Sequence, residues 1–469
     1  MKKHRELAKA SWKGAELGVE AELLDDVFES RGATQFVGYD QFECDAEVIA
    51  IIKDGQRVEE AREGNEVKIV LDETPFYAAS GGQIGDTGSL TFGDLPGKKS
   101  AIRNPQSAIF EVGDTQKTPS AIALHVGRVA KGRIAVGDSC RAAIDGPRRQ
   151  AIMRNHTATH VMQAALKQVL GKHVTQRGSE VTAEALRFDF THHAAMTAEQ
   201  IAEVERLVAE NVCANHPVRV DVMAQEEAFK TGAIAPFGEK YGATVRVVRV
   251  GDWSTEFCGG SHLRASGDIG AFVITGESSI AAGTRRIEAM TGPGATAYVS
   301  SLRATLQGVT SALSCKPGEA AERIGAMQKE IKTLRKEADK KRQQSAASGV
   351  DDIIAAAKTI GPAKFIAHRF EGLAVNDLRN TADVIRAKAA NAIIVLASVE
   401  AENKVSIVCA VDKSLTSKIK AGDLAKTVAT ICGGSGGGRP DMAQAGGKDA
   451  SKLAEAFAAA ERLVTAALT

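Results

Sequence analysis

Two short segments that lie far apart in the chain carry four side chains of the kind that bind metal ions. In RNHTATH, His156 and His160 are spaced i, i+4, so that on a helix both imidazoles lie on one face within reach of a single ion. In CGGSH, Cys258 and His262 add a thiolate and a third imidazole. Zn²⁺ prefers such a set of one sulfur and three nitrogen ligands, so the sequence predicts a zinc site that constrains the whole fold.

The 469 residues are too many for one hydrophobic core, and at about 150 residues per domain we expect roughly three domains. Hydrophobic residues make up 44% and charged residues 25%, as in ordinary globular proteins, and the net charge of +1 identifies no partner. The seven cysteines follow no disulfide framework, and no apolar run reaches membrane length. We therefore expect a cytoplasmic protein with no membrane partner.

The N-terminal half changes from helical to strand-like patterning. Residues 1–42 carry apolar residues at helical spacing and end at the breaker in SRGATQF, which predicts a helical segment or linker. Residues 43–150 contain short β-branched runs separated by Gly, Asp and Pro turns, which predicts a small β-barrel. Residues 151–294 then alternate helix and strand, beginning with the histidine helix, which predicts a zinc-binding α+β domain.

The C-terminal part begins with a long helical pattern. Residues 295–348 are predicted to form a helical arm. Ile324, Met327 and Ile331 follow a heptad pattern in it, and an intramolecular arm is favoured over a long dimeric coiled coil because barely three heptads are present. Residues 349–469 alternate strand and helix around a glycine-rich loop, which predicts a compact α/β domain.

Several motifs together resemble one known family. A resemblance to the editing domain of alanyl-tRNA synthetases covers RNHTATHVMQAALKQVLGKHVTQRGSEVTAEALRFDFTH and STEFCGGSHLRASGDIGAFVITGESSIAAGTRRIEAMTG. The segment TPFYAASGGQIGDTG is similar to a glycine-rich turn of the neighbouring β-barrel, and GGSGGGRPDMAQAGG is similar to the signature of the C-terminal tRNA-binding domain. The resemblance implies a multidomain α+β fold with a small β-barrel, a zinc-binding editing domain, a helical arm and a C-terminal α/β domain.

The resemblance begins at the end of the helical region of a synthetase, and the sequence has no paired class II signatures for ATP. It therefore implies the C-terminal half of an alanyl-tRNA synthetase, which alone does not activate alanine. The segment ELLDDVFESRGATQFVGYDQFECDAEV resembles the synthetase linker before the barrel, and this favours such a half over a free-standing editing factor. The implied activity is hydrolysis of tRNA(Ala) that wrongly carries serine or glycine.

Three alternative functions stay open on the sequence. The chain is part of an alanine ligase whose aminoacylation half is a separate chain, or it is a tRNA-binding module with a structural zinc and no catalysis. The third alternative is a metal hydrolase that acts on free esters of small amino acids.

Hydrolysis of an aminoacyl ester needs an activated water and a stabilised oxyanion. The resemblance places Gln176 in the pocket, whereas a solvated loop glutamine is the ordinary alternative. Helical geometry lets Thr157 or Thr159 line a cavity beside the metal, although a threonine in a helix often bonds its own backbone. We expect Cys258 to be a catalytic group as well as a ligand. Four protein ligands complete a tetrahedral shell, so the ion either activates water after a ligand is displaced or mainly shapes the pocket.

Five arginines, which lie in this domain or directly before it, are candidates for tRNA binding. Arg148, Arg149 and Arg154 adjoin the proposed entrance to the site, and a solvated linker is their ordinary alternative. Arg285 and Arg286 are a pair of guanidinium groups that suits phosphates, although an ion pair with Asp189 or Glu288 is an equally ordinary outcome.

The C-terminal glycine run is a further candidate for tRNA binding. Gly436, Gly437 and Gly438 can expose backbone amides to a phosphate, and Arg439 supplies a guanidinium beside them. A flexible loop without a ligand is the alternative for this run.

Overall fold

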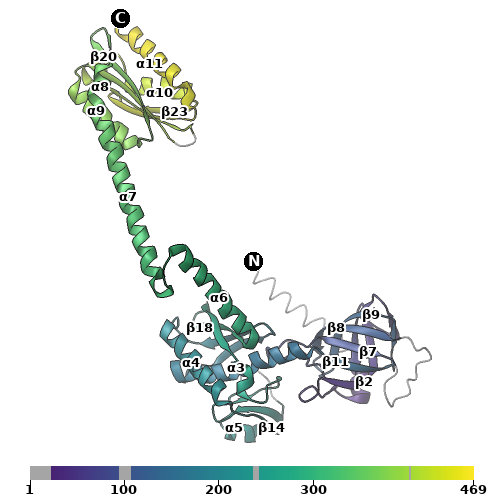
Figure 1. The fold of residues 1–469 in the computed structure, drawn as a ribbon. Coiled ribbons are helices and arrows are strands. Elements are labelled where there is room, and N and C mark those ends of the chain that lie inside the picture. The colour runs from purple at the N-terminus through teal and green to yellow at the C-terminus, as the bar shows by residue number, and fades with distance from the viewer. Residues whose placement is uncertain (1–22, 94–106, 236–241, 401–402) are drawn as a thin grey trace. The chain divides into compact units, whose positions relative to one another are not determined.

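The structure is a computed structural model, and it describes residues 23–93, 107–235, 242–400 and 403–469. The chain divides into two compact units, between Leu306 and Gln307 (Figure 1). The predicted helical segment over residues 1–42 lies partly outside the described residues, which begin at residue 23. In its described part the chain forms helix α2 (Asp25–Arg31) and the short strand β1 (Gln35–Phe36).

The first unit begins with a β-barrel, which confirms the predicted one. Seven strands form its described sheet, in the order β11-β7-β8-β9-β5-β2-β3. They are β2 (Glu43–Lys53), β3 (Gln56–Val58), β5 (Glu66–Leu71), β7 (Gly88–Phe92), β8 (Ala108–Lys117), β9 (Ala123–Lys131) and β11 (Ser139–Ile144). Because β11 pairs with β2 as well as β7, six strands close into the barrel, and β3 only extends the hairpin from β2. Buried residues alternate along β2 and β11, as a barrel wall requires.

Two separate pairs of short strands accompany the barrel. They are β4 (Glu60–Arg62) with β10 (Arg133–Ala135), and β1 with β6 (Glu73–Thr74).

Strand β11 leads directly into the long helix α3 (Gly146–Leu170), on which the first histidine pair lies. The Asp145 side chain caps this helix by accepting a hydrogen bond from the backbone N–H of Arg148, and Pro147 occupies the first turn, where its missing N–H costs nothing. The helix start is therefore fixed by local sequence at the point where the barrel ends.

The α+β part around α3 contains two antiparallel sheets in its described residues. One has the order β12-β13-β18-β17, and the other has the order β14-β15-β16. The strands are β12 (Gln176–Val181), β13 (Leu186–Thr191), β14 (Val218–Ala224), β15 (Thr244–Val250), β16 (Ser254–Phe257), β17 (Phe272–Ala281) and β18 (Thr284–Thr291). The helices are α4 (Ala198–Ala214), α5 (Gln225–Lys230), the 3₁₀ turn η1 (Ser266–Ile269) and α6 (Gly292–Leu313), which crosses the division between the units.

The second unit contains a six-stranded described sheet in the order β19-β20-β21-β22-β24-β23, with β20 and β21 parallel and the other pairs antiparallel. The strands are β19 (Lys358–Ile360), β20 (Ala363–Glu371), β21 (Ala392–Val399), β22 (Val405–Val411), β23 (Ser435–Gly438) and β24 (Met442–Gly447). The helices are α7 (Ala320–Ser348), α8 (Val350–Ala355), α9 (Val375–Lys388), α10 (Ala421–Ile431) and α11 (Leu453–Leu468). Short 3₁₀ turns are η2 (Pro317–Glu319), η4 (Lys413–Leu415) and η5 (Ala450–Lys452).

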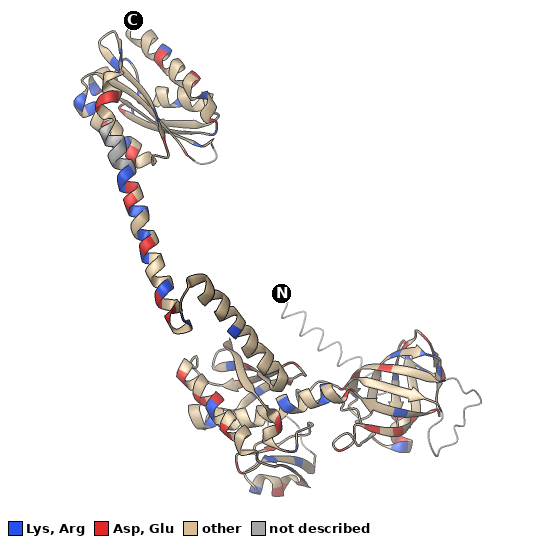
Figure 2. Cartoon of the chain, in the orientation of Figure 1, with Lys and Arg blue, Asp and Glu red and all other residues tan. Residues whose placement is uncertain are grey.

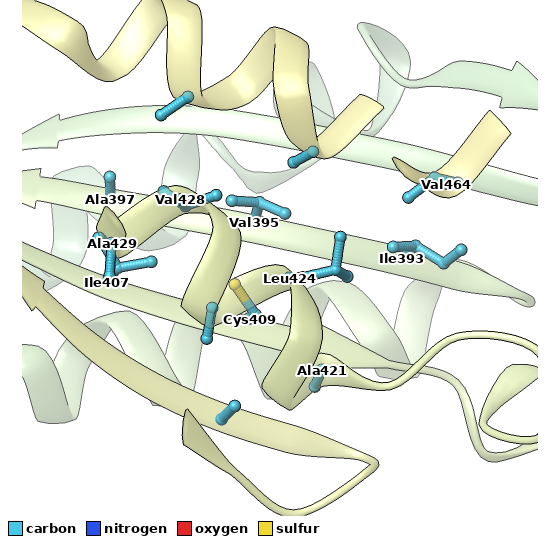
Figure 3. Packing of buried hydrophobic residues seen from close by; sticks show 14 of the residues in the cluster. Ile393, Val395, Ala397, Ile407, Cys409, Ala421, Leu424, Val428, Ala429 and Val464 are labelled. Atoms are coloured by element: carbon cyan, nitrogen blue, oxygen red, sulfur yellow. The ribbon is translucent and has the colours of Figure 1, made fainter. Parts of the chain in front are cut away.

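Helices cover both faces of this sheet, which gives the predicted α/β domain two cores. Ile393 and Val395 of β21 face a cluster that includes Leu424 of α10 and Val464 of α11 (Figure 3). The alternate residue Ile394 faces the other cluster, with α8 and α9. A strand buried on both faces reads as a continuous apolar run, as AIIVLASV does.

The predicted helical arm is present as helix α7, along which acidic and basic side chains are interspersed (Figure 2). Ile324, Met327 and Ile331, which follow the heptad pattern, are between 41% and 48% exposed within this chain. The described helices include none that is both long and apolar enough to cross a membrane.

The glycine run is not the loop that the sequence predicts. Ser435–Gly438 form the edge strand β23, which pairs antiparallel with β24. A Cβ atom on Gly436 would lie 2.1 Å from the Ala445 Cβ, and one on Gly438 would lie 2.6 Å from the Ala443 Cα. The missing side chains therefore serve close approach to the neighbouring strand.

Candidate metal centre

The four predicted ligands come together in the first unit. One donor atom from each of His156, His160, Cys258 and His262 lies within 4.8 Å of the others. The Cys258 Sγ lies 3.3 Å from Nε2 of His156 and 3.2 Å from Nε2 of His262. Ligands on a tetrahedral zinc-like ion at about 2.0 and 2.3 Å would be roughly 3.5 Å apart, so the spacing suits one small ion.

Every histidine of the cluster has its Nδ1 atom held by a neighbouring side chain. The three pairs are His156 with Gln83 Oε1 (2.7 Å), His160 with Glu256 Oε2 (2.7 Å) and His262 with Thr157 Oγ1 (3.3 Å). These contacts orient the rings and direct the Nε2 atoms to the centre of the cluster, as partners of metal-binding histidines do. Among the described residues, Nε2 of His160 is buried without a hydrogen-bond partner, which a metal ion would supply. The residues present therefore fit a metal ion.

The electrostatics of the cluster favour a thiolate. Burial alone would raise the pKa of Cys258, but the neighbouring imidazoles, with His156 first, hold it well below its ordinary value. Burial also disfavours a charged His160, yet Glu256 and Cys258 raise its pKa to about 10, whereas burial lowers the pKa of His262 to about 3. The lowered pKa of Cys258 favours the thiolate form, which is the form that binds a metal cation.

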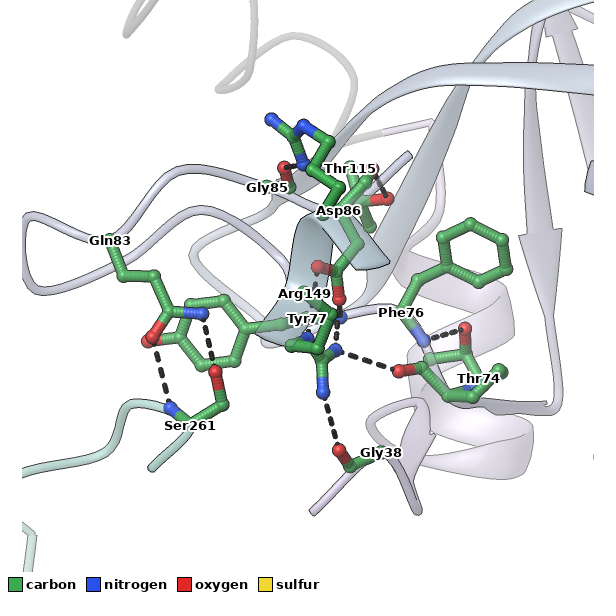
Figure 4. A network of polar contacts seen from close by, with 12 residues as sticks. Gly38, Thr74, Phe76, Tyr77, Gln83, Gly85, Asp86, Thr115, Arg149 and Ser261 are labelled. Atoms are coloured by element: carbon green, nitrogen blue, oxygen red, sulfur yellow. Dashed lines mark hydrogen bonds and ion pairs between the residues drawn. The ribbon is translucent and has the colours of Figure 1, made fainter. Parts of the chain in front are cut away.

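The barrel reaches this site through its glycine-rich segment. Gln83 accepts a hydrogen bond from the His156 ring. It also accepts one from the backbone N–H of Ser261 and donates one to the Ser261 hydroxyl (Figure 4). The same segment supplies Asp86, which pairs with the fully buried Arg149 of α3. Gln83 and Asp86 of this one segment therefore contact α3 at two residues, His156 and Arg149, that lie about two helical turns apart.

The loop that carries Cys258 is held in place from the opposite side. The Arg246 guanidinium donates to the carbonyl oxygens of Cys258 (3.0 Å) and Gly260 (2.7 Å), and it lies 4.0 Å from the centre of the Tyr39 ring. The Tyr39 hydroxyl donates to the carbonyl of Gly259. A Cβ atom on Gly260 would lie 2.0 Å from His156 Cε1, so only glycine fits beside this ligand.

A cavity of about 330 Å³ lies beside the cluster, and we refer to it as the metal pocket. Both the barrel and the α+β part contribute to its wall. Its lining includes Tyr77, Ser80, Lys117, His156, Thr159, His160, Gln176, Arg246, Cys258 and Gly259. Three of the four metal ligands therefore face a space that a small substrate can enter.

The predicted catalytic side chains occupy different places. Gln176 lines the metal pocket, and its amide donates to Ser179 at 3.2 Å. Thr159 also lines the pocket and donates to the backbone carbonyl of Asn155. Thr157 is fully buried behind His262 and is not among the lining residues, because its hydroxyl accepts a hydrogen bond from a backbone N–H next to that ligand. The expectation that Thr157 contacts substrate is therefore corrected to a supporting contact with a ligand.

One predicted RNA contact is wrong. Arg149 is fully buried, and its guanidinium donates to Asp86 and to the carbonyl oxygens of Gly38 (2.6 Å) and Pro75 (3.0 Å) (Figure 4). Arg148 and Arg154 are half-buried and each donates to one backbone carbonyl.

Arg285 and Arg286 both form ion pairs, but the partner of Arg285 is not one of the carboxylates that the sequence indicated. Arg285 pairs with Glu277, and Arg286 pairs with Asp189 through two bonds of 2.6 and 2.8 Å. By contrast, the Arg439 side chain is 76% exposed, with its Nε 3.6 Å from Asp441.

The sequence analysis missed two residues that contact ligands. Gln83 was assigned to a turn, because nothing local links the barrel to the metal helix. Glu256 stands two residues before Cys258, so a strand would place both on one face, and this signal was available.

Comparison with known families agrees with this arrangement. The model described as "Threonyl and Alanyl tRNA synthetase second additional domain" matches residues 245–288, which include two of the ligands. The model described as "tRNA synthetases class II (A)" matches residues 1–148, and the "DHHA1 domain" model matches residues 363–466.

Curated relatives match along almost the whole chain. Alanine–tRNA ligase from Hydrogenovibrio crunogenus is 45% identical over 433 residues, which are 92% of this chain and 48% of the relative. The ligase from Bacillus subtilis is 43% identical over 92% of this chain and 48% of its own length, and that from Acetivibrio thermocellus is 40% identical over 100% and 52%. Among solved structures, the C-Ala domain from Aquifex aeolicus alanyl-tRNA synthetase matches at 29% identity over 23% of this chain and 97% of that domain, with a TM-score of 0.23.

The four-ligand cluster, two members of which lie in the matched second additional domain, defines a protein of the tRNA synthetase class. The chain belongs to the alanyl-tRNA synthetase family, which confirms the resemblance seen in its sequence. It spans about half the length of the curated relatives that it matches, and the matched part is their C-terminal half.

Proposed function

We propose that the chain is a zinc-dependent hydrolase that removes serine or glycine from mischarged tRNA(Ala). The observation that carries the proposal is the four-ligand cluster, three members of which line a pocket in a domain of the editing type. We assign the barrel and zinc-binding parts, residues 43–150 and 151–294, to this reaction, and residues 349–469 to tRNA binding.

Zinc is the metal that the ligand set favours. One thiolate and three imidazoles suit its softness, and the donor spacing suits its tetrahedral preference. When bound, zinc would supply positive charge that polarises an ester carbonyl, and it would lower the pKa of a water molecule toward about 7 once that water displaces one of the four ligands.

The chain's own residues orient the ester. An ester carbonyl that enters the metal pocket approaches the cluster on the side of His156, His160 and Cys258, because these ligands line it. Arg246 also lines the pocket, and its charge favours the negative oxygen that develops as water attacks.

Polar groups on the pocket wall give a basis for sparing alanine. The Thr159 hydroxyl uses its hydrogen on a backbone carbonyl, so its oxygen can accept a hydrogen bond from the hydroxyl of a serine substrate. Gln176 offers a second polar group on the same wall. Alanine has no hydroxyl and makes neither contact. A separate hydrolytic site is needed because an aminoacylation site for alanine rejects amino acids of similar size only weakly.

The test is serine release from Ser-tRNA(Ala), measured for the zinc-loaded chain, the metal-stripped chain and Cys258→Ala. We expect release by the zinc-loaded wild type, and its loss in the other two with loss of bound metal. Cys213→Ala changes an exposed cysteine of α4 and should retain both metal and activity. A folded, zinc-loaded wild type that releases no serine would contradict the proposal and leave a tRNA-binding module with structural zinc.

A second candidate concerns the whole enzyme. The matched relatives are alanine–tRNA ligases, so the chain would supply editing and tRNA binding to such a ligase. Co-purification with a class II catalytic chain, and alanylation by the pair alone, would support this candidate.

A further inference from the structure

A second cavity, of about 320 Å³, lies next to the metal pocket, and we refer to it as the aromatic pocket. Tyr77, Ser80, Lys117 and Gly259 line both cavities. Gly259 directly follows the ligand Cys258, so the shared wall lies beside the metal cluster. The two cavities therefore form neighbouring compartments with one common rim.

Aromatic side chains are concentrated in this second compartment. Aromatic residues make up 4% of the chain, yet Phe36, Tyr39, Phe76 and Tyr77 all line this one cavity. The Phe36 ring is half-buried and meets Tyr39 and Tyr77 edge-on, at centroid distances of 4.8 and 5.9 Å. A cavity lined by aromatic rings suits a flat, aromatic ligand.

These walls are held in place without a ligand. The Tyr39 hydroxyl donates to the Gly259 carbonyl (2.7 Å), and the Arg246 guanidinium lies over its ring. The Tyr77 hydroxyl donates to the carbonyl of Ser80. Such preorganisation lowers the cost of binding, because the rings lose little freedom when a ligand enters.

We propose that the aromatic pocket binds the purine base of the 3′-terminal nucleoside whose ribose carries the ester. This inference rests on the proposed function. If the ester carbonyl lies at the metal cluster, the base lies about one ribose away, and the shared rim places the aromatic pocket beside the ester. The exposed Lys117 stands on that rim, where its charge suits the phosphate that precedes the nucleoside.

A hydroxyl group in the aromatic pocket can add a hydrogen bond to the stacking of the base on the rings. Thr34 lines the aromatic pocket, and its hydroxyl oxygen accepts a hydrogen bond from the backbone N–H of Ala123 at 3.0 Å. The hydrogen of this hydroxyl can be donated to an acceptor nitrogen on the edge of a base. The site thus offers rings for the faces of a base, a hydroxyl for its edge and an ammonium for the phosphate.

The first measurement compares two serine esters, one on the ribose of adenosine and one on methanol, in wild type and Phe36→Leu. Leucine retains apolar volume but removes the ring. We expect the KM for the adenosine ester to rise at least about tenfold, because loss of base stacking has effects of that size, with kcat little changed. Hydrolysis of the methyl ester should not change. Phe28→Leu alters an aromatic residue of α2 that is 41% exposed and does not line either cavity, so it should behave as wild type.

A second measurement does not depend on catalysis. Adenosine monophosphate and ribose 5-phosphate, which has no base, are titrated into the folded zinc-loaded chain by ligand-observed NMR. We expect adenosine monophosphate to bind at least about tenfold more tightly than ribose 5-phosphate, and Phe36→Leu to abolish that difference. Equal binding of both ligands, or an unchanged KM in Phe36→Leu, would overturn the base site. Failure of the wild type to hydrolyse any serine ester, with base-dependent binding intact, would instead reject the proposed function alone.

Discussion

Replacement of Gln83 by alanine is predicted to weaken metal binding although Gln83 is not a ligand. Its buried amide makes bonds of 2.7 Å with His156 and 2.9 Å with both the backbone N–H and the hydroxyl of Ser261. Without this amide, the His156 ring and the loop that carries Cys258 lose the side chain that holds both in place. Loss of such a partner typically costs 10–100-fold in metal affinity, or about 1.4–2.7 kcal/mol, and we expect this loss for Gln83→Ala.

The assay is competition for zinc between the protein and a chromogenic chelator at neutral pH. Gln83→Glu keeps two acceptor oxygens for the ring and the backbone N–H, so it should retain affinity better than the alanine variant. Gln116→Ala removes a half-buried barrel glutamine that bonds Asp114 instead, and it serves as the matched control. A Gln83→Ala variant that binds zinc within twofold of wild type would refute the claim that the barrel positions the ligand.

Three further predictions concern stability and RNA binding. Asp86→Asn leaves a fully buried arginine without its countercharge, so urea unfolding should show a loss of about 3–5 kcal/mol, whereas Asp26→Asn, in an exposed pair, should change stability little. Burial lowers the pKa of His125 from 6.5 to about 4, so the unfolded chain takes up the proton first, and stability falls as pH drops from 6.5 to 4. Over this pH range the free energy of unfolding should fall by about 3 kcal/mol more in the wild type than in His125→Gln. If the two proteins lose stability in parallel, protonation of His125 is not the cause. Arg439→Ala should weaken tRNA binding and lower by about 1 the slope of the logarithm of the binding constant against the logarithm of salt concentration. Arg369→Ala, which removes an arginine from an exposed ion pair, should change neither.

The parts of the fold that the sequence predicts are those set by local periodicity. The alternating burial of barrel strands, the apolar run of β21 and the helical spacing before Leu170 are all visible without any tertiary contact. The metal cluster was also predictable, because i, i+4 spacing fixes His156 and His160 on one helix face and the ligand types limit the ion.

The errors lie where distant backbone decides the outcome. The glycine run forms β23 because β24 lies beside it, and no local sequence pattern predicts a strand made of glycines. Arg149 looks like a surface cation in RRQ, but Asp86 and two carbonyl groups from the barrel enclose it. Gln83 was missed for the same reason, because its partner His156 is brought to it only by the fold.

The most direct test of the account compares deacylation rates of Ser-tRNA(Ala) and Ala-tRNA(Ala) by the same zinc-loaded chain under single-turnover conditions. The polar wall of the metal pocket predicts fast release of serine and a much slower release of alanine, and Thr159→Val should slow serine release while leaving the alanine rate unchanged. Equal rates for both substrates in the wild type would contradict the account, because the pocket would then not distinguish the amino acid that the site is proposed to remove.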